Sequence, residues 1–185
     1  MKVFLRINNK QLFCAIIVSI VLLQVSPNSL LDGSGDLSIG TVLFLVLRCF
    51  FALIVLLGWP YTVGINLYRK LPNTVKMNIR VFKIVLGYLS VYFVAFILLS
   101  DGVLLDSGVS DFSEMYLFPF HLVSMICLAY CFYFISEILR SVELQQPVVL
   151  DDYKYYLFLF LFYPFTLWYI QQRINKIFED ATIVE

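Results

Sequence analysis

The chain has 185 residues, of which 61% are hydrophobic and only 14% are charged. Soluble domains contain about 45–50% apolar and about 25% charged residues, so this composition excludes an ordinary soluble protein and predicts one embedded in lipid. Thirteen Lys and Arg residues balance thirteen Asp and Glu residues, and this zero net charge argues against nucleic-acid binding. We therefore expect a single all-α integral membrane domain over residues 1–185.

The first predicted transmembrane span covers about residues 11–31. Three cations precede it in MKVFLRINNK, and the loop that follows, 32–36, contains two acids and no cation. The basic start resembles a signal peptide, but no small-x-small cleavage site precedes Pro27, so we expect an uncleaved span. The positive-inside rule then places the N-terminus in the cytoplasm and the acidic loop outside.

The second predicted span lies within residues 39–68, a run of thirty residues that contains no acid and one base, Arg48. As a helix this run is about 45 Å long, enough to cross the bilayer together with its headgroups. Pro60 predicts a kink. We expect Arg48 to lie near the outer boundary and to extend its guanidinium group to the headgroups. In the alternative, Arg48 lies deeper, paired with an acid or lining a substrate path.

Residues 69–83 are the main reference for the predicted topology. This stretch, RKLPNTVKMNIRVFK, holds five of the thirteen lysines and arginines and lies between two apolar runs. Cation-rich loops stay in the cytoplasm, so we predict a cytoplasmic loop of a multi-pass protein in the inner (plasma) membrane of the cell. The third span then covers residues 81–100 and leads to an outer segment, 101–114, with four acids and no base.

The fourth predicted span covers residues 115–138 and ends in the cytoplasm at Glu137 and Arg140. The chain's only histidine, His121, lies on this span within about two turns of its outer end, on a stripe of small and polar residues. Such a stripe is typical of helix packing, so we expect His121 to hydrogen-bond a neighbouring helix or a headgroup. The alternative is a ligand-binding or proton-transfer role.

The C-terminal membrane segment, 155–178, follows a polar linker. Its apolar run is only about 24 Å long as a straight helix, and Pro164 interrupts it. We predict a re-entrant or interfacial hairpin of two helices, broken at Tyr163 and Pro164. The second helix presents an apolar face made of Leu167, Ile170, Ile174, Ile177 and Phe178.

Charges and aromatic residues support this hairpin. Arg173 and Lys176 follow the apolar run and argue against an outer C-terminus, while Trp168 is suited to the interfacial belt. The alternative is that 155–178 crosses the bilayer, which would give five transmembrane helices in place of four.

The second half of the chain resembles a group of small, uncharacterised bacterial integral membrane proteins. The resemblance runs from HLVSMICLAYCFYFISEILRSVEL, residues 121–144, through LFYPFTLWYIQQRINKIF, residues 161–178. The positions that match the group's C-terminal motif are Phe162, Pro164, Trp168, Ile170, Gln171, Arg173, Ile174 and Asn175. An extra Tyr163 precedes the proline, and Gln172 replaces the motif's second proline. The resemblance implies a bacterial inner-membrane protein with a recurring membrane-proximal element, and no particular activity.

Catalytic motifs are not evident in the sequence. It contains no GxSxG, GxxxxGK[ST], HExxH or GxGxxG pattern. The four cysteines all lie in apolar runs, so they are not spaced as a secreted disulfide framework or a zinc site. We therefore predict no catalytic residue, cofactor or metal.

The expected function is that of a non-catalytic accessory, assembly or regulatory subunit. Such a protein would act by packing against a membrane-protein partner or a second copy of itself within the lipid bilayer. The alternative is a small transporter or channel for ions or a neutral solute, acting as an oligomer, and a membrane-embedded enzyme ranks third. The candidate functional or packing residues are Arg48, His121, Trp168, Arg173 and Asn175.

Overall fold

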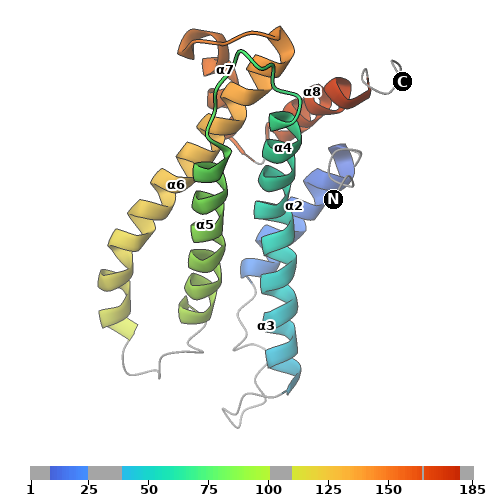
Figure 1. Ribbon diagram of the computed structural model, residues 1–185. Helices are drawn as coiled ribbons and strands as arrows, with labels where there is room; N and C mark the ends of the chain where they lie inside the picture. The colour runs from blue at the N-terminus through green and yellow to red at the C-terminus, as the bar shows by residue number, and fades with distance from the viewer. Residues whose placement is uncertain (1–8, 25–38, 101–109, 164, 180–185) are drawn as a thin grey trace.

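The structure is a computed structural model that describes residues 9–24, 39–100, 110–163 and 165–179. Every regular element within these residues is a helix (Figure 1). Three helices are long and apolar enough to cross a membrane: Val42–Tyr68, Ile79–Leu99 and Leu117–Leu144. The predicted all-α fold is therefore confirmed, and its composition and helix lengths suit a membrane protein.

The first described helix, α2, covers Asn9–Gln24 and is shorter than these three. It packs against α3, η2 and α8, and it buries Leu12 and Ile16 completely. The hydroxyl of Ser19 donates to the carbonyl of Ala15 at 2.7 Å, which satisfies this buried polar group within the helix. The rest of the predicted span 11–31 and the acidic loop 32–36 lie outside the described residues.

The second element is one continuous helical rod made of α3, Ile39–Ala52, a π-helical turn η2, Leu53–Leu57, and α4, Gly58–Tyr68. In η2 the N–H of Gly58 bonds to the carbonyl of Leu53, five residues earlier. Proline lacks an N–H and its ring crowds the carbonyl four residues before it, so Pro60 disturbs the regular helix at this position. A wider turn relieves that crowding, and the expected kink takes the form of a π-helical turn.

The next two helices, α5 at Ile79–Ser100 and α6 at Ser110–Leu144, lie beside the rod and run antiparallel to each other (Figure 1). α6 passes beyond the predicted end at 138 and continues to Leu144. It continues because Leu139 and Val142 remain buried where α6 packs against α4 and α7. It ends before Gln145, whose φ of 53° lies in the left-handed region that terminates helices.

The last two helices are α7, Leu150–Leu161, and α8, Leu167–Glu179. The sequence predicted a polar linker up to residue 155, but α7 starts earlier. The Asp152 carboxylate accepts a hydrogen bond from the N–H of Val149 at 2.9 Å, and an acid in the first turn is favoured by the helix dipole. Side-chain capping therefore moves the helix start into a stretch that composition alone marks as a loop.

α7 and α8 pack against each other as a hairpin, with the break between Leu161 and Leu167, where the sequence predicted it. The hydroxyl of Thr166 bonds to the carbonyl of Leu159 across this turn. Three of the five predicted apolar-face residues are fully buried and the other two are half-buried. The predicted amphipathic second helix is therefore confirmed.

Both open ends of this hairpin lie at the end of the bundle that carries the 69–78 connection (Figure 1). We call this the basic end; its cations include Arg69, Lys70, Arg80, Arg140, Arg173 and Lys176. The other end, where α3 and α6 begin, is called the opposite end. Two hydrogen bonds hold the hairpin at the basic end. The Tyr156 hydroxyl donates to Glu143 at 2.8 Å, and the Lys70 ammonium donates to the Ile177 carbonyl at 2.8 Å.

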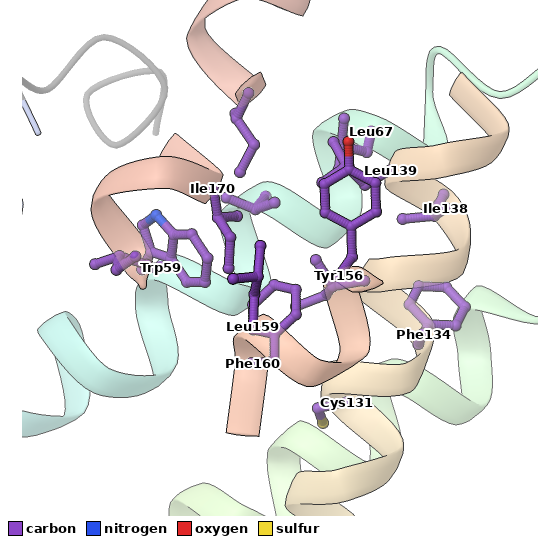
Figure 2. Packing of buried hydrophobic residues seen from close by; sticks show 14 of the residues in the cluster. Trp59, Leu67, Cys131, Phe134, Ile138, Leu139, Tyr156, Leu159, Phe160 and Ile170 are labelled. Atoms are coloured by element: carbon purple, nitrogen blue, oxygen red, sulfur yellow. The ribbon is translucent and has the colours of Figure 1, made fainter. Parts of the chain in front are cut away.

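The hydrophobic core lies where the hairpin meets α4 and α6 (Figure 2). Trp59 of α4 is completely buried, with its ring centroid 6.2 Å from that of Phe160 and 5.9 Å from that of Tyr163. Phe82 of α5 stacks on Phe134 of α6 at 4.4 Å between centroids. Aromatic side chains from α4, α5, α6 and the hairpin therefore belong to one contiguous core at the basic half of the bundle.

Candidate functional site

The structure does not gather the five predicted candidate residues at one site. Trp168, Arg173 and Asn175 share α8 at the basic end, whereas Arg48 lies on α3 and His121 on α6, toward the opposite end. The structure instead shows three separate features: a polar cluster between α5 and α6 beside a cavity, a charged cavity at the basic end, and an apolar groove between α3 and α5.

Arg48 is buried, with only 4% of its surface exposed. It lies on the same face of α3 as Leu45 and Ala52, which are also buried. The expectation that its guanidinium group extends away from the bundle to the headgroups is therefore wrong. The short helix α2 packs against α3, which the spacing of residues in α3 alone does not reveal.

His121 contacts the neighbouring helix α5. Its Nδ1 lies 2.6 Å from the hydroxyl of Tyr92, and its ring lies near Phe96, 5.9 Å between centroids. One turn further along α6, the Ser124 hydroxyl donates to the Phe120 carbonyl at 2.8 Å and lies 3.3 Å from the Tyr88 hydroxyl. These hydrogen bonds connect α5 and α6 through polar groups in an otherwise apolar interface.

A cavity of about 370 Å³ adjoins this polar cluster. Its lining comes from η2, α4, α5, α6 and the turn of the hairpin, and it is mainly apolar. Tyr92, His121 and Ser124 supply polar groups, and Tyr163 adds a buried hydroxyl that has no hydrogen-bond partner among the described residues. No Asp, Glu, Lys or Arg of the described chain lines the cavity, so it suits a neutral, largely apolar molecule with one or two hydrogen-bonding groups.

The basic end contains a second polar cluster centred on Glu143 of α6. Its carboxylate accepts hydrogen bonds from Arg140 at 3.0 Å and from the Tyr156 hydroxyl at 2.9 and 2.8 Å, and Arg173 of α8 approaches to 3.9 Å. Burial, followed by the hydrogen bond to Glu143 and its negative charge, raises the pKa of Tyr156 above its usual 10.0. Tyr156 therefore remains a neutral donor that links α7 to α6.

A cavity of about 440 Å³ opens beside Glu143. Its charged lining residues are Lys70, Arg140, Glu143, Arg173 and Lys176. Four cations and one acid, from the end of α4, from α6 and from α8, therefore surround the same space. This is the strongest concentration of one charge sign in any of the three features.

No protein-family model, curated protein or solved structure matches the chain. The resemblance of its second half to a group of bacterial membrane proteins therefore remains a prediction. Among the described residues, no three His, Cys, Asp or Glu side chains lie close enough together to hold a metal ion.

The third feature is a groove of about 390 Å³ between α3 and α5 near the opposite end. It is lined by aliphatic and aromatic side chains and by one cysteine: Val42, Leu45, Val46, Cys49, Phe50, Leu53, Val94 and Leu98. Val46 is 58% exposed and Phe50 is 63% exposed, so these side chains project outward along one side of the groove.

A buried polar contact on α8 was missed in the sequence. The indole N–H of Trp59 donates to the Gln171 side-chain oxygen at 2.8 Å, and the Gln171 amide donates to Asn175 at 2.8 Å. The signal was present, because Gln171 falls on the same helical face as Ile170 and Ile174 and therefore had to be buried with a partner. Asn175 thus supports a packing contact, whereas Trp168 is 41% exposed on the other face.

Proposed function

We propose that this chain is a four-span inner-membrane protein with a re-entrant C-terminal hairpin, and that it acts as a non-catalytic subunit packing against another membrane protein. The hairpin's two ends both lie at the basic end, which supports re-entry in place of a fifth crossing. α7 and α8 contain 12 and 13 residues, about 18–20 Å each, against a hydrocarbon core of about 30 Å. Cation-rich connections face the cytoplasm, so the basic end is assigned to that side.

The groove between α3 and α5 carries the functional proposal. It has a volume of about 390 Å³ and an apolar lining, and it lies on the half of the bundle where few of the described side chains are buried. Helix association in lipid depends on close van der Waals packing, because lipid tails are as apolar as the side chains and leave no hydrophobic driving force. A rigid transmembrane helix fills a fixed groove of this kind better than mobile acyl chains, so we assign the groove to a helix of a partner protein.

Site-specific photocrosslinking in intact cells tests this assignment. A photoreactive amino acid placed at Val46, on the groove, should give one discrete protein adduct. The matched control is Ile84 of α5, which is 71% exposed but does not line the groove. The adduct at Val46 should have the mass of a different protein added to this chain, and the control position should give lipid adducts only.

A substitution then links the adduct to the groove. Val46→Trp should fill the groove and abolish co-purification of the crosslinked partner, while Ile84→Trp should leave it unchanged. Circular dichroism of both variants checks that the helices remain folded. Lipid adducts alone at Val46 would overturn the proposal, and an adduct with twice the chain's own mass would replace the partner with a second copy.

Transport of a small neutral solute is the second candidate. The observation in its favour is the 370 Å³ cavity, where Tyr92, His121, Ser124 and Tyr163 provide hydrogen-bonding groups inside an apolar wall. If this function holds, proteoliposomes that contain only this protein should accumulate the solute, and Tyr163→Phe should alter the rate without unfolding the protein. Flux equal to that of empty liposomes for a panel of neutral solutes would remove this candidate.

A further inference from the structure

The cavity at the basic end differs in charge from every other hollow described above. Four cationic side chains line it, and Glu143 is the only acid among its lining residues. The cations come from three separate elements: Lys70 follows α4, Arg140 lies on α6, and Arg173 and Lys176 are one turn apart on α8. The fold therefore brings together cations that are far apart in the sequence.

The single acid of the cavity is already engaged. Glu143 is only 13% exposed and accepts hydrogen bonds from Tyr156 and from its neighbour Arg140. The Oε1 atom of Glu143 lies 3.9 Å from Nη1 of Arg173, a distance too long for a strong hydrogen bond. Lys176 is exposed, and none of the ion pairs found among the described residues includes it. The positive charges of Arg173 and Lys176 on α8 are therefore only partly neutralised by Glu143.

Arg140 provides a second, independent observation. Its Nη1 bonds to Glu143, but its Nε is buried without a hydrogen-bond partner among the described residues. The rest of the Arg140 side chain is 31% exposed and lines the cavity, so guanidinium donors other than Nε can reach an anion there. The planar guanidinium group is suited to oxyanions.

We infer that the 440 Å³ cavity between α4, α6 and α8 binds a phosphate group, with Arg140, Arg173 and Lys176 as its ligands. Phosphate presents several acceptor oxygens, which fits cations that approach from different elements. Under the proposed topology, on which this depth rests, the cavity lies at headgroup level on the cytoplasmic side, since Lys70 of the cation-rich 69–78 connection lines it and Tyr155, near the open end of the hairpin, is an exposed aromatic residue. The phosphate can therefore come from an acidic lipid or from a soluble compound.

Native mass spectrometry of the 185-residue chain in detergent tests this inference with two sources of phosphate, a lipid headgroup and inorganic phosphate. Phosphatidylglycerol and phosphatidylcholine with identical acyl chains are compared at equal concentration, and inorganic phosphate is added in a separate competition. The wild-type protein should retain phosphatidylglycerol in preference to phosphatidylcholine. Displacement of the acidic lipid by millimolar inorganic phosphate would show that soluble phosphates occupy the site, and no displacement would assign it to the lipid headgroup.

Charge-removing variants locate the binding. Lys176→Gln should weaken phosphatidylglycerol binding about fivefold, and Arg173→Gln with Lys176→Gln more than about tenfold, because a cation near an acidic headgroup contributes about that factor. The matched control removes two cations of the same end that lie outside the cavity, with Arg80→Gln and Lys154→Gln, and should retain wild-type binding.

Two outcomes would overturn the inference. One is a wild-type protein without preference for the acidic lipid and without affinity for inorganic phosphate. The other is an equal loss of binding in the cavity and control variants, which would assign the preference to general surface charge. Because Arg173 also bonds the Tyr169 hydroxyl at 2.8 Å, thermal unfolding of each variant is measured in parallel, and the single Lys176→Gln variant decides the test if the double variant unfolds.

Discussion

The two halves of the long rod α3–η2–α4 differ sharply in how they are packed. In α4, at the basic half, Trp59, Val63 and Leu67 are completely buried. In α3, at the opposite half, the residues between 42 and 51 include only two buried side chains, while Val46 and Leu47 are each 58% exposed. Both halves are apolar in sequence, so hydrophobicity alone does not determine which half is packed.

The α7–α8 hairpin explains this difference. It packs against α6 and α2 and contacts Trp59 of α4, so it fills the space between helices at the basic half. The described residues include no comparable element at the opposite half, where α5 and α6 meet through the contacts of His121 and Ser124. Among the described residues, buried contacts are therefore concentrated at the basic half, and we expect tertiary stability to be concentrated there as well.

The largest expected effect comes from removing the indole at the centre of the packed half. Trp59→Ala leaves a cavity against Phe160 and Tyr163 and removes the donor to Gln171. We expect it to lower the free energy of unfolding by about 3 kcal/mol, measured by denaturant titration in mixed micelles. The matched variant Phe50→Ala, at a 63% exposed aromatic of the opposite half, should change it by less than about 1 kcal/mol.

Equal losses for Trp59→Ala and Phe50→Ala would contradict the proposed concentration of stability. Gln171→Leu separates the hydrogen bond from the packing, since it nearly keeps the volume of the side chain but leaves the indole N–H of Trp59 without its acceptor. Its cost should be about 1 kcal/mol, because hydrogen bonds inside membrane proteins are individually weak.

The next largest loss of stability is expected at Gly64, where α4 lies close to Phe82 of α5. A Cβ atom added at Gly64 would lie 2.6 Å from two ring atoms of Phe82. Phe82 is completely buried and stacked on Phe134, so its ring has no room to move. We expect Gly64→Ala to lower the free energy of unfolding by about 2 kcal/mol, the usual cost of overpacking a rigid core.

Gly87 of α5 is the matched control for Gly64. A Cβ atom added there meets no atom within 4 Å. Gly87→Ala should leave stability unchanged or raise it by up to about 1 kcal/mol, because alanine favours the helix. A loss at Gly87 as large as that at Gly64 would mean that helix geometry, and not the contact with Phe82, sets the effect.

Much of this fold was predictable because apolar runs and their interruptions are local properties of the sequence. The run 39–68, the break at the Tyr163–Pro164 position and the apolar face of α8 all follow from composition and spacing. The burial of Arg48 was not predictable, because it depends on tertiary packing around α3, which the sequence of α3 alone does not reveal. The start of α7 at Leu150 was not predicted either, since a side-chain cap outweighed the polar composition of that stretch.

The charged site was harder to predict than the fold. Arg173 was selected as a candidate, but Glu143 and Tyr156 were not, because their partnership joins residues on two helices. Glu143 was assigned to a linker on composition, whereas it lies on the last turns of α6 and faces the cavity. Identifying such a cluster requires the helix ends to be known within one turn, which charge and hydropathy patterns do not provide.

The smallest expected effect concerns the hydrogen bond that joins α7 to α6. Tyr156→Phe removes the donor to Glu143 and should lower the free energy of unfolding by about 1 kcal/mol near neutral pH. The equivalent change in the opposite half, Tyr92→Phe, removes an exposed hydrogen bond to His121 and should cost less.

The pH dependence distinguishes a specific bond from general packing. Burial and Glu143 raise the pKa of Tyr156 in the folded state above 10.0, so its contribution to stability is complete below pH 10.0 and declines as the pH rises beyond that value. The stability difference between wild type and Tyr156→Phe should therefore shrink between about pH 10 and about pH 12. Because both chains keep the aromatic ring, a difference that stays constant over this interval would indicate that the hydroxyl does not act through its hydrogen bond to Glu143.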